Sequence, residues 1–302
     1  MWIVAGADGL IGSRLLERAR AVHDPVLGST RRMRGRDGTL FADFSSDDHA
    51  QIVQARPDVV FVCAAMTSMQ ACDREPDLAR RINVTAPVGL AGRLMQQGAF
   101  VVFLSSNTVF DGTVPFPDED TPVSPVNEYG RQKVEAERRL RALPGADRLL
   151  AVARLSKVAV PDAGLPATFI HRLRSGDICE ALDDLLLSPV SGDCVVDGLC
   201  RIAAERRAGV FHLTGDLEMS YAQFATELAS RLGLEAGRVR SVSSLAKGLQ
   251  LAFKPAHPAL GSRRTREQGI EPETGEQFWA RFCAAALGRH AAVAHDPGEA
   301  GR

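Results

Sequence analysis

The first twelve residues constrain the fold of this 302-residue chain more than any other segment. The stretch WIVAGADGLIG sets Gly6, Gly9 and Gly12 between an apolar run and a helical pattern. Such a turn points free backbone N–H groups at the N-terminus of a helix, where a phosphate binds, and a Cβ on the turn would block the phosphate. This context predicts a dinucleotide site. The alternative is a helix start that is rich in glycine for conformational reasons alone.

Short apolar runs alternate with amphipathic stretches through the first half of the chain. The runs carry many β-branched residues and little polar alternation, which is typical of strands buried on both faces; they cover residues 2–7, 25–30, 58–65, 100–106 and 148–156. Strands separated by helices indicate βαβ crossovers and a parallel sheet. We therefore expect an α/β fold, a Rossmann-type doubly wound parallel sheet with a smaller C-terminal lobe that binds substrate.

The pattern loosens in the second half of the chain, which suggests a division into two parts. The end of the chain has little to bury, so we expect it to be disordered. The predicted parts are a cofactor domain at 1–157 plus about 186–215, a substrate lobe at 158–185 plus 216–286, and a disordered tail at 287–302.

Composition argues against several classes of partner. A net charge of -1 gives no reason to expect nucleic acid or an anionic membrane surface. No apolar run approaches the roughly 18–20 residues of a membrane helix, and the sequence opens on a strand pattern, so we expect no signal peptide. The six cysteines lack CxxC or CxxH spacing, so we expect reduced thiols, a cytoplasmic protein and no metal site.

The residues after the second predicted strand bear on the choice of cofactor. An acidic residue there accepts from the ribose 2′-hydroxyl and favours NAD, whereas basic residues favour the 2′-phosphate of NADP. This chain has Ser29, Thr30, Arg31 and Arg32 at that point, with no carboxylate before Asp37. Because the planar guanidinium group binds phosphate well, we predict NADPH as the cofactor. A solvated basic loop is the alternative.

Tyr129 and Lys133 lie four residues apart in a predicted helix, one turn apart on one face. We expect the ammonium charge to lower the pKa of the phenol, which could then give a proton to a carbonyl oxygen while a nicotinamide moves hydride. Ser106 ends a predicted parallel strand, where ligands of such sheets bind, and could hold the same oxygen. Two alternatives stay open: a Tyr-Lys pair that shares a helix face by chance, and a turn at Ser105 and Ser106 that merely ends the strand.

Three motifs in this order, GADGLIG, SSNTVFDG and YGRQK, resemble the extended short-chain dehydrogenase/reductases. Within these, VFDG and PVNEYGRQKVEAE make the chain most similar to the dTDP-4-dehydrorhamnose reductase group, which binds sugar nucleotides. The likeness covers roughly residues 1–285. It implies a Rossmann-type cofactor domain, a small lobe for the sugar nucleotide, and a catalytic set of Ser106, Tyr129 and Lys133.

The motifs and the resemblance together give an expected site. Asp43 could accept from the adenine amino group or cap the next helix, and Asn83 could order water or backbone near the lysine or be a helix-interior asparagine. Expected cofactor-binding residues are Gly6, Asp8, Gly9, Leu10, Ile11, Gly12, Ser29, Thr30, Arg31, Arg32, Asp43, Phe44, Cys63, Ala64, Ala65, Asn83, Ser105, Tyr129 and Lys133. Expected substrate-binding residues are Thr67, Ser106, Asn107, Thr108 and Lys157.

The chain departs from the reductase group where it should face the sugar. That group usually has Thr-Asp-Tyr at Ser106, Asn107 and Thr108, a tryptophan at Lys157 and often an asparagine at Cys63. These changes leave the cofactor chemistry intact but put dTDP-4-keto-rhamnose in question as the substrate. We expect a roomier, less negative pocket in which Lys157 suits a sugar with a carboxylate or another acceptor, unless it points to solvent.

The leading interpretation is NADPH-dependent reduction of a 4-keto nucleotide sugar, with a homodimer left open. An epimerase or dehydratase would use an additional acid–base residue beside the serine, and Asn107 and Thr108 supply none. A third interpretation, from another class, is a non-catalytic NADP-binding regulatory subunit such as the β subunit of methionine adenosyltransferase. In the basic 254–264 segment, Lys254 or Arg263 could meet a diphosphate, although a solvated loop is favoured.

Overall fold

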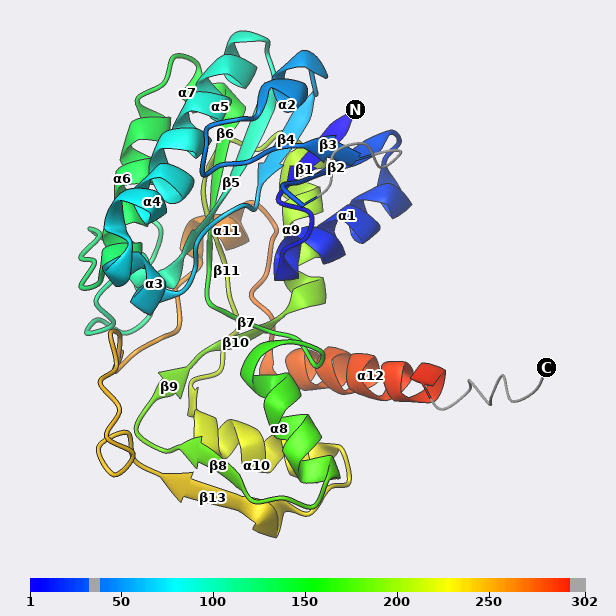
Figure 1. Cartoon of the computed structure of the whole chain (residues 1–302), viewed down its shortest axis with the longest axis vertical. Coiled ribbons are helices and arrows are strands. Elements are labelled where there is room, and N and C mark those ends of the chain that lie inside the picture. Colours follow the sequence, from blue (N-terminus) through cyan, green and yellow to red (C-terminus); the bar gives the residue numbers. More distant parts are fainter. Residues whose placement is uncertain (33–38, 294–302) are drawn as a thin grey trace, which may run out of the picture.

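A seven-stranded parallel sheet forms the centre of the larger part of the molecule (Figure 1). The computed structural model describes residues 1–32 and 39–293. The strand order is β11-β6-β5-β4-β1-β2-β3, so the order reverses between β1 and β4, and ligands of such sheets bind at that point, beyond the carboxyl ends of the strands. The strands are β1 (Trp2–Ala5), β2 (Val26–Thr30), β3 (Thr39–Phe41), β4 (Val59–Val62), β5 (Phe100–Ser106), β6 (Leu150–Leu155) and β11 (Gly209–Leu213).

Helices cover both faces of this sheet, which explains why its strands lack polar alternation. Successive residues of β4 show the two faces, because Phe61 packs with α1 and α9 whereas Val60 and Val62 pack with α5 and α6. One face carries α1 (Leu10–Val22) and α9 (Gly192–Ala204); the other carries α2 (Ala50–Gln54), α5 (Ala86–Gln96), α6 (Glu128–Arg141) and α7 (Ala146–Leu149). The loop between β4 and α5 holds α3 (Met69–Arg74), α4 (Pro76–Arg80) and a π-helical turn, η1 (Arg81–Thr85).

The smaller C-terminal lobe has its own core of aromatic side chains. Phe224 lies against Phe278, Trp279 and Phe282, with ring centroids 5.2–6.2 Å away. Its elements are α8 (Gly164–Arg174), β8 (Cys179–Leu182), β9 (Leu186–Leu187), β12 (Met219–Ser220), α10 (Tyr221–Arg231), η3 (Ala236–Arg238), β13 (Val239–Val242) and α12 (Gly275–Val293). The prediction of an α/β fold with a parallel sheet and a smaller C-terminal lobe is confirmed.

Short strands join the two parts where they meet in Figure 1. There β7 (Lys157–Ala159) runs parallel to β10 (Pro189–Ser191). Within the range of about 186–215 that we assigned to the cofactor domain, α9 and β11 pack with the large sheet, whereas β9 pairs with β12 of the lobe.

The last helix reaches further than the sequence suggested. We expected a disordered tail at 287–302, but α12 continues to Val293. A helix satisfies its backbone hydrogen bonds internally, and the alanine-rich end of α12 favours helix without needing burial. Residues 294–302 lie outside the described part of the chain.

Candidate functional site

The glycine turn between β1 and α1 has the shape that a phosphate needs. Gly6 has φ +90°, and a Cβ on it would lie 2.7 Å from the Ala64 nitrogen; a Cβ on Gly12 would collide with the Gly6 carbonyl. A Cβ on Gly9 would meet the Gly6 carbonyl at 3.4 Å, an ordinary contact, and α1 starts there without a side-chain cap. Gly6 and Gly12 thus permit close packing, and the N–H groups of Leu10 and Ile11 at the start of α1 have no partner within the helix. These residues fit a dinucleotide pyrophosphate.

The hydroxyl groups at the end of β2 hold this turn in place. Ser29 Oγ accepts a hydrogen bond from the Gly6 N–H at 3.2 Å, and Thr30 Oγ1 donates to the Asp8 carboxylate. Ser29 and Thr30 are buried, so they support the turn more than they face a ligand. The Asp8 contact was not anticipated, and it brings a carboxylate to the strand end where none was expected. Arg31 and Arg32 are exposed directly after the end of β2.

Asp43 does not cap the next helix, and its carboxylate is bonded within the turn that follows β3. Its carboxylate accepts from the Ser45 N–H at 2.9 Å and from Ser45 Oγ at 2.6 Å, which closes a turn. The Ser45 hydroxyl is the main cause that lowers the pKa of the Asp43 carboxyl, with a smaller contribution from Arg31. The next helix, α2, begins after His49 with no side-chain cap, so Asp43 does not cap it. Phe44 is buried beside this turn.

The loop after β4 lies across the strand from the glycine turn. The N–H groups of Cys63 and Ala64 both donate to the Ala5 carbonyl, and Cys63, Ala64 and Ala65 are half-buried. Burial raises the pKa of the Cys63 thiol to about 12, so this cysteine stays protonated and unreactive. Further along the loop, Thr67 is exposed. These residues lie beyond the carboxyl ends of β1 and β4, where the strand order reverses.

Asn83 supports this loop from within the protein. Its Oδ1 accepts from the Met66 N–H at 2.8 Å, and its Nδ2 donates to Met66 O at 3.0 Å and to Gln132 Oε1 at 2.8 Å. The side chain is fully buried in the π-helical turn η1. Asn83 therefore ties the loop after β4 to α6 and would position a cofactor without touching it. Gln132, which sequence reasoning missed, lies between Tyr129 and Lys133 on the same helix.

Helix α6 brings Tyr129 and Lys133 to the carboxyl end of β5. A Cβ on Gly130 would collide with the Thr108 carbonyl, so this glycine lets α6 pack directly on the turn after β5. Asn127 begins the helix and accepts from the Gly130 N–H at 2.8 Å. Lys133 Nζ donates to Leu104 O of β5 at 2.8 Å, and it lies 5.7 Å from the centre of the Tyr129 ring.

The electrostatic expectation for this pair was wrong in direction. Burial raises the pKa of the Tyr129 phenol above its usual value, and Cys72 adds to this effect. Burial also lowers the pKa of Lys133 to about 8, against the opposing charge of Glu137. Desolvation therefore outweighs the attraction between the lysine charge and a phenolate, because Tyr129 packs in an apolar cluster with Cys72 and Ala79.

The residues that follow β5 are bonded mainly to one another and to the smaller lobe. Ser106 Oγ accepts from the Thr108 N–H at 3.2 Å and from Thr108 Oγ1 at 3.1 Å, and so begins the short helix η2 (Asn107–Val109). Thr108 is buried. Asn107 Nδ2 donates to Pro258 O at 3.0 Å, across to the smaller lobe. Of these three residues, Ser106 and Asn107 are partly exposed to solvent.

Lys157 differs from the other lysines of the chain in its surroundings. Those three are bonded: Lys133 to Leu104, Lys247 to Glu180 and Lys254 to Asp184. The Lys157 ammonium has no hydrogen bond or ion pair within residues 1–32 and 39–293. Its side chain keeps access to solvent, although the surrounding protein lowers the pKa of the ammonium.

The sequence did not lead us to expect the buried ion pair between Glu137 of α6 and Arg154 of β6. Ser105 Oγ donates to Glu137 Oε1 at 2.6 Å, and Arg154 Nη2 donates to Glu137 Oε2 at 2.7 Å, with the acid and the arginine only 1% and 2% exposed. Glu137 is one helical turn beyond Lys133, so helical spacing alone could have pointed to it. Ser105, which we expected at the cofactor, is buried in this network.

The network continues through His212 to the segment around α11, which packs against β11. His212 Nδ1 lies 2.6 Å from Gly261 O and therefore carries the proton, and Nε2 accepts from Arg154 at 3.4 Å. The His212 N–H donates to Thr265 Oγ1 at 2.9 Å, in the short helix α11 (Arg263–Glu267). Burial, aided by the charge of Arg154, lowers the pKa of His212 to about 4.

The basic residues of the 254–264 segment are occupied by acids of the same chain. Lys254 Nζ donates to Asp184 at 2.7 Å, and Arg263 donates to Asp120 at 2.6 Å. Neither cation is free for a diphosphate in this arrangement.

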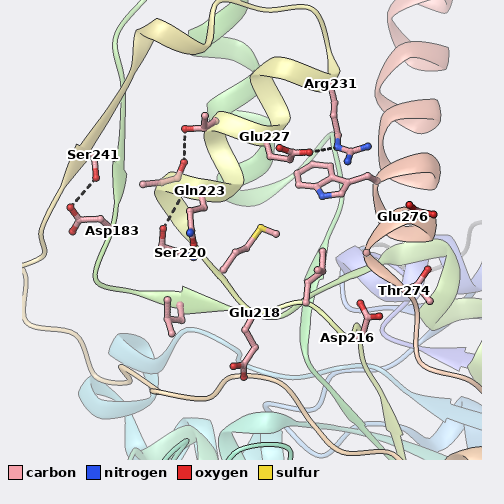
Figure 2. Close-up of a pocket in the computed structure, with 17 residues that line it drawn as sticks. Asp183, Asp216, Glu218, Ser220, Gln223, Glu227, Arg231, Ser241, Thr274 and Glu276 are labelled. Atoms are coloured by element: carbon pink, nitrogen blue, oxygen red, sulfur yellow. Dashed lines mark hydrogen bonds and ion pairs between the residues drawn. The ribbon is translucent and has the colours of Figure 1, made fainter.

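A large pocket of 1250 Å³ lies in the smaller lobe, away from Tyr129 (Figure 2). Acidic side chains line it together with Arg231 and Trp279, and Ser106, Tyr129 and Lys133 are not among its lining residues. Within residues 1–32 and 39–293, no three His, Cys, Asp or Glu side chains gather as a metal site, and no helix is long and apolar enough to cross a membrane.

The RmlD substrate binding domain family matches residues 1–285. dTDP-4-dehydrorhamnose reductase of Streptomyces griseus is 30% identical over 281 residues, which cover 90% of this chain and 88% of that protein. Methionine adenosyltransferase 2 subunit beta of Xenopus laevis is 28% identical over 280 residues, 90% of this chain and 83% of that protein.

Solved structures agree with this assignment at the level of the fold. The crystal structure of dTDP-4-dehydrorhamnose reductase from Yersinia enterocolitica has a TM-score of 0.82 and 22% identity, and the match covers 95% of this chain and 99% of that one. The resemblance inferred from the sequence motifs is confirmed. This chain belongs to the RmlD substrate binding domain family, among the extended short-chain dehydrogenase/reductases similar to dTDP-4-dehydrorhamnose reductase.

Proposed function

We propose that the chain is an NADPH-dependent reductase of a 4-keto sugar carried on a nucleotide. The observation that carries this proposal is the contact of Gly130 with Thr108, which sets Tyr129 and Lys133 beside the end of β5. The glycine turn of β1 lies two strands away in the same sheet, about 10 Å by the usual strand spacing. A dinucleotide that lies along the carboxyl edge would reach from one to the other.

The residues present fit the cofactor. Free N–H groups at the start of α1 would hold its pyrophosphate, Arg31 and Arg32 would hold a 2′-phosphate, and Lys133 would hold the nicotinamide ribose. NADPH, when bound, supplies the hydride. The residues of the chain supply binding, orientation and the proton.

Tyr129 would give the proton to the keto oxygen of the substrate. Its raised pKa keeps the phenol protonated at neutral pH, so it is ready to act as an acid in the direction of reduction. Ser106 would donate a hydrogen bond to the same oxygen once substrate displaces the bond that its hydroxyl donates to Asn107 Oδ1 at 3.4 Å. Asn83 and Gln132 would hold the helix that carries the tyrosine.

The sugar should differ from, or extend beyond, dTDP-4-keto-rhamnose. Lys157 has no partner within the described chain, and strand alternation sets it on the same side of β7 as Ala159, which packs in the core of the smaller lobe. The β5–β6 register sets Leu155 opposite Ser106, two residues before this lysine. An unpaired ammonium at that place favours a sugar with a carboxylate or another acceptor.

The test is NADPH oxidation with a panel of nucleotide keto sugars, including the neutral substrates named for the relatives and a keto sugar with a carboxylate. We expect turnover in the wild type and none in Tyr129→Phe. Lys157→Met should reduce turnover of the acidic sugar more than that of neutral sugars. Turnover of dTDP-4-keto-rhamnose alone, at full efficiency, would contradict the proposed substrate.

A non-catalytic regulatory role is the second candidate, because several relatives of similar identity are named methionine adenosyltransferase 2 subunit beta. The arrangement of Ser106, Tyr129 and Lys133 favours catalysis. NADPH binding without turnover of any sugar in the panel, together with capture of a methionine adenosyltransferase catalytic subunit, would favour the regulatory role instead.

A further inference from the structure

The segment that contains His257 and Pro258 contacts the turn that follows β5. Asn107 Nδ2 donates to Pro258 O at 3.0 Å, and the His257 N–H donates to Gly112 O at 2.8 Å. Asn107 directly follows the serine of the proposed catalytic set. These contacts hold the backbone at His257 and Pro258 against the turn that follows β5, although 151 residues separate Asn107 and Pro258 in the sequence.

Glu218 fixes the ring of His257. One carboxylate oxygen of Glu218 accepts from the Ala259 N–H at 2.9 Å, and the other lies 3.4 Å from His257 Nδ1. Figure 2 shows the Glu218 carboxylate turned away from the pocket that its neighbours line. A carboxylate at Nδ1 favours the tautomer with the proton on Nδ1 and leaves Nε2 as a base.

The free nitrogen of this ring is accessible. His257 Nε2 has no hydrogen bond to any residue that the structure describes, and the side chain is 37% exposed. An imidazole oriented at one nitrogen by a carboxylate and open at the other is the usual arrangement of a general acid–base group. Because its segment contacts the turn after β5, this nitrogen is a candidate for a second acid–base group besides Tyr129.

We propose that His257, oriented by Glu218, exchanges the proton on the carbon next to the keto group of the substrate. This inference rests on the proposed function, because it takes the same nucleotide keto sugar as substrate. It adds an activity to reduction, because the proton on that carbon exchanges with solvent before hydride arrives. Return of the proton by the same imidazole, on the same face, retains the configuration of the carbon, so the proposed activity is proton exchange.

The step is balanced without an oxidant or a reductant. His257 Nε2 takes the proton from the carbon beside the carbonyl, and the electron pair of that C–H bond forms the C=C bond of an enol. The carbonyl π pair moves to the oxygen, which takes a proton from Tyr129. In the reverse direction the enol gives its proton back to Tyr129, and the carbon takes a proton from the imidazolium, which exchanges with solvent in the meantime.

The experiment uses the full chain with NADP⁺, so that no hydride is available, and dTDP-4-keto-6-deoxyglucose in D₂O. NMR would follow deuterium at the carbons next to the keto group. We expect exchange above the protein-free rate, and a loss of about 100-fold in His257→Gln, the usual size of a general acid–base contribution. Glu218→Gln keeps an acceptor for the Ala259 N–H but removes the charge, and it should lose exchange by a smaller factor.

The control and the contrary outcomes separate the two proposals. His171→Gln, on the exposed side of α8, should keep both exchange and NADPH oxidation. NADPH oxidation without any exchange would overturn the role of His257 and leave the reductase proposal standing, as would exchange that survives His257→Gln. Exchange without NADPH oxidation would support His257 and contradict the reductase. Absence of both with every sugar of the panel would overturn both.

Discussion

At the scale of single residues, the end of β2 carries opposite charges within a short span. Asp8 reaches Thr30 from the glycine turn, and the exposed Arg31 and Arg32 follow directly. The carboxylate would suit a ribose hydroxyl, and the arginines would suit a phosphate. The choice between NADH and NADPH therefore depends on the balance between these groups.

Replacing both Arg31 and Arg32 by alanine should weaken NADPH binding far more than NADH binding. A charge-assisted hydrogen bond contributes about 1.5–3 kcal/mol, so we expect a loss of ~10- to 100-fold for NADPH and little change for NADH. Fluorescence titration of the two reduced cofactors measures this. Asp8→Asn is the counterpart and should shift preference toward NADPH. Equal losses for both cofactors in the double variant would show that the arginines do not contact the 2′-phosphate.

Tyr129→Phe should abolish turnover with nearly unchanged cofactor affinity, because the ring preserves packing and only the proton donor is lost. Lys133→Ala should damage both, since it loses the ribose contact and the bond to Leu104. The Lys133 pKa of about 8 means that its ammonium is charged below that pH and neutral above it. Binding of cofactor should therefore weaken as pH rises through about 8, as titrations at several pH values would show. Substantial turnover in Tyr129→Phe would contradict the acid role.

At the scale of elements, α6 is the part of the site that the sequence describes best. The presence of a helix here and the shared face of Tyr129 and Lys133 both follow from local spacing. What the sequence could not supply are the partners from distant segments. Asn83 meets Gln132 from 49 residues away, and Arg154 meets His212 from 58 residues away, because the sheet brings these elements together. The pKa of Tyr129 is raised where we expected it to be lowered, because it depends on burial, which the spacing of residues does not reveal.

Gly130→Ala should separate α6 from the turn after β5. The added Cβ meets the Thr108 carbonyl, a backbone atom that cannot turn aside, so we expect a loss of about 1–3 kcal/mol in unfolding free energy and a large loss of turnover. Gly92→Ala in α5 is the matched control, because its Cβ would meet only the Leu143 side chain at 3.6 Å. That control should be neutral or slightly stabilising in urea denaturation. Equal effects of the two substitutions would show that the close approach of α6 is unimportant.

At the scale of the whole molecule, one buried polar network joins distant segments of the chain on the large sheet. It runs from Glu137 on α6 through Arg154 and His212 to Gly261 and to Thr265 on α11, which packs against β11. Such a network is costly if any member loses its partner, because the others are then buried without compensation. The segment around α11 should therefore lose structure together with the sheet.

Acid should weaken the fold through His212 before the carboxylates titrate. In the folded protein its pKa is about 4, whereas an unfolded histidine titrates near 6.5, so the unfolded chain binds more protons between these values. Stability then falls as pH drops through this window, by on the order of 3 kcal/mol in full. His49, also buried with a lowered pKa, adds an effect of the same sign.

Urea denaturation at pH 7 and at pH 5 measures this effect. His212→Gln should be less stable than the wild type at pH 7 and should show a smaller loss between the two pH values. His171→Gln, an exposed control, should follow the wild type. The same pH dependence in wild type and His212→Gln would contradict the linkage to His212.

The path of the chain through β11 limits how this protein can be rearranged. After β6 the chain enters the smaller lobe, returns through α9 and β11 to finish the large sheet, and leaves again toward α12. A truncation after residue 157 would leave the edge of β6 open for pairing with other chains. The smaller lobe is therefore built from two segments of the chain, one before α9 and one after β11. A chimera that transfers substrate preference between relatives must exchange both segments and keep α9 and β11 between them. Joining the N-terminal half of one protein to the C-terminal half of another would not achieve this.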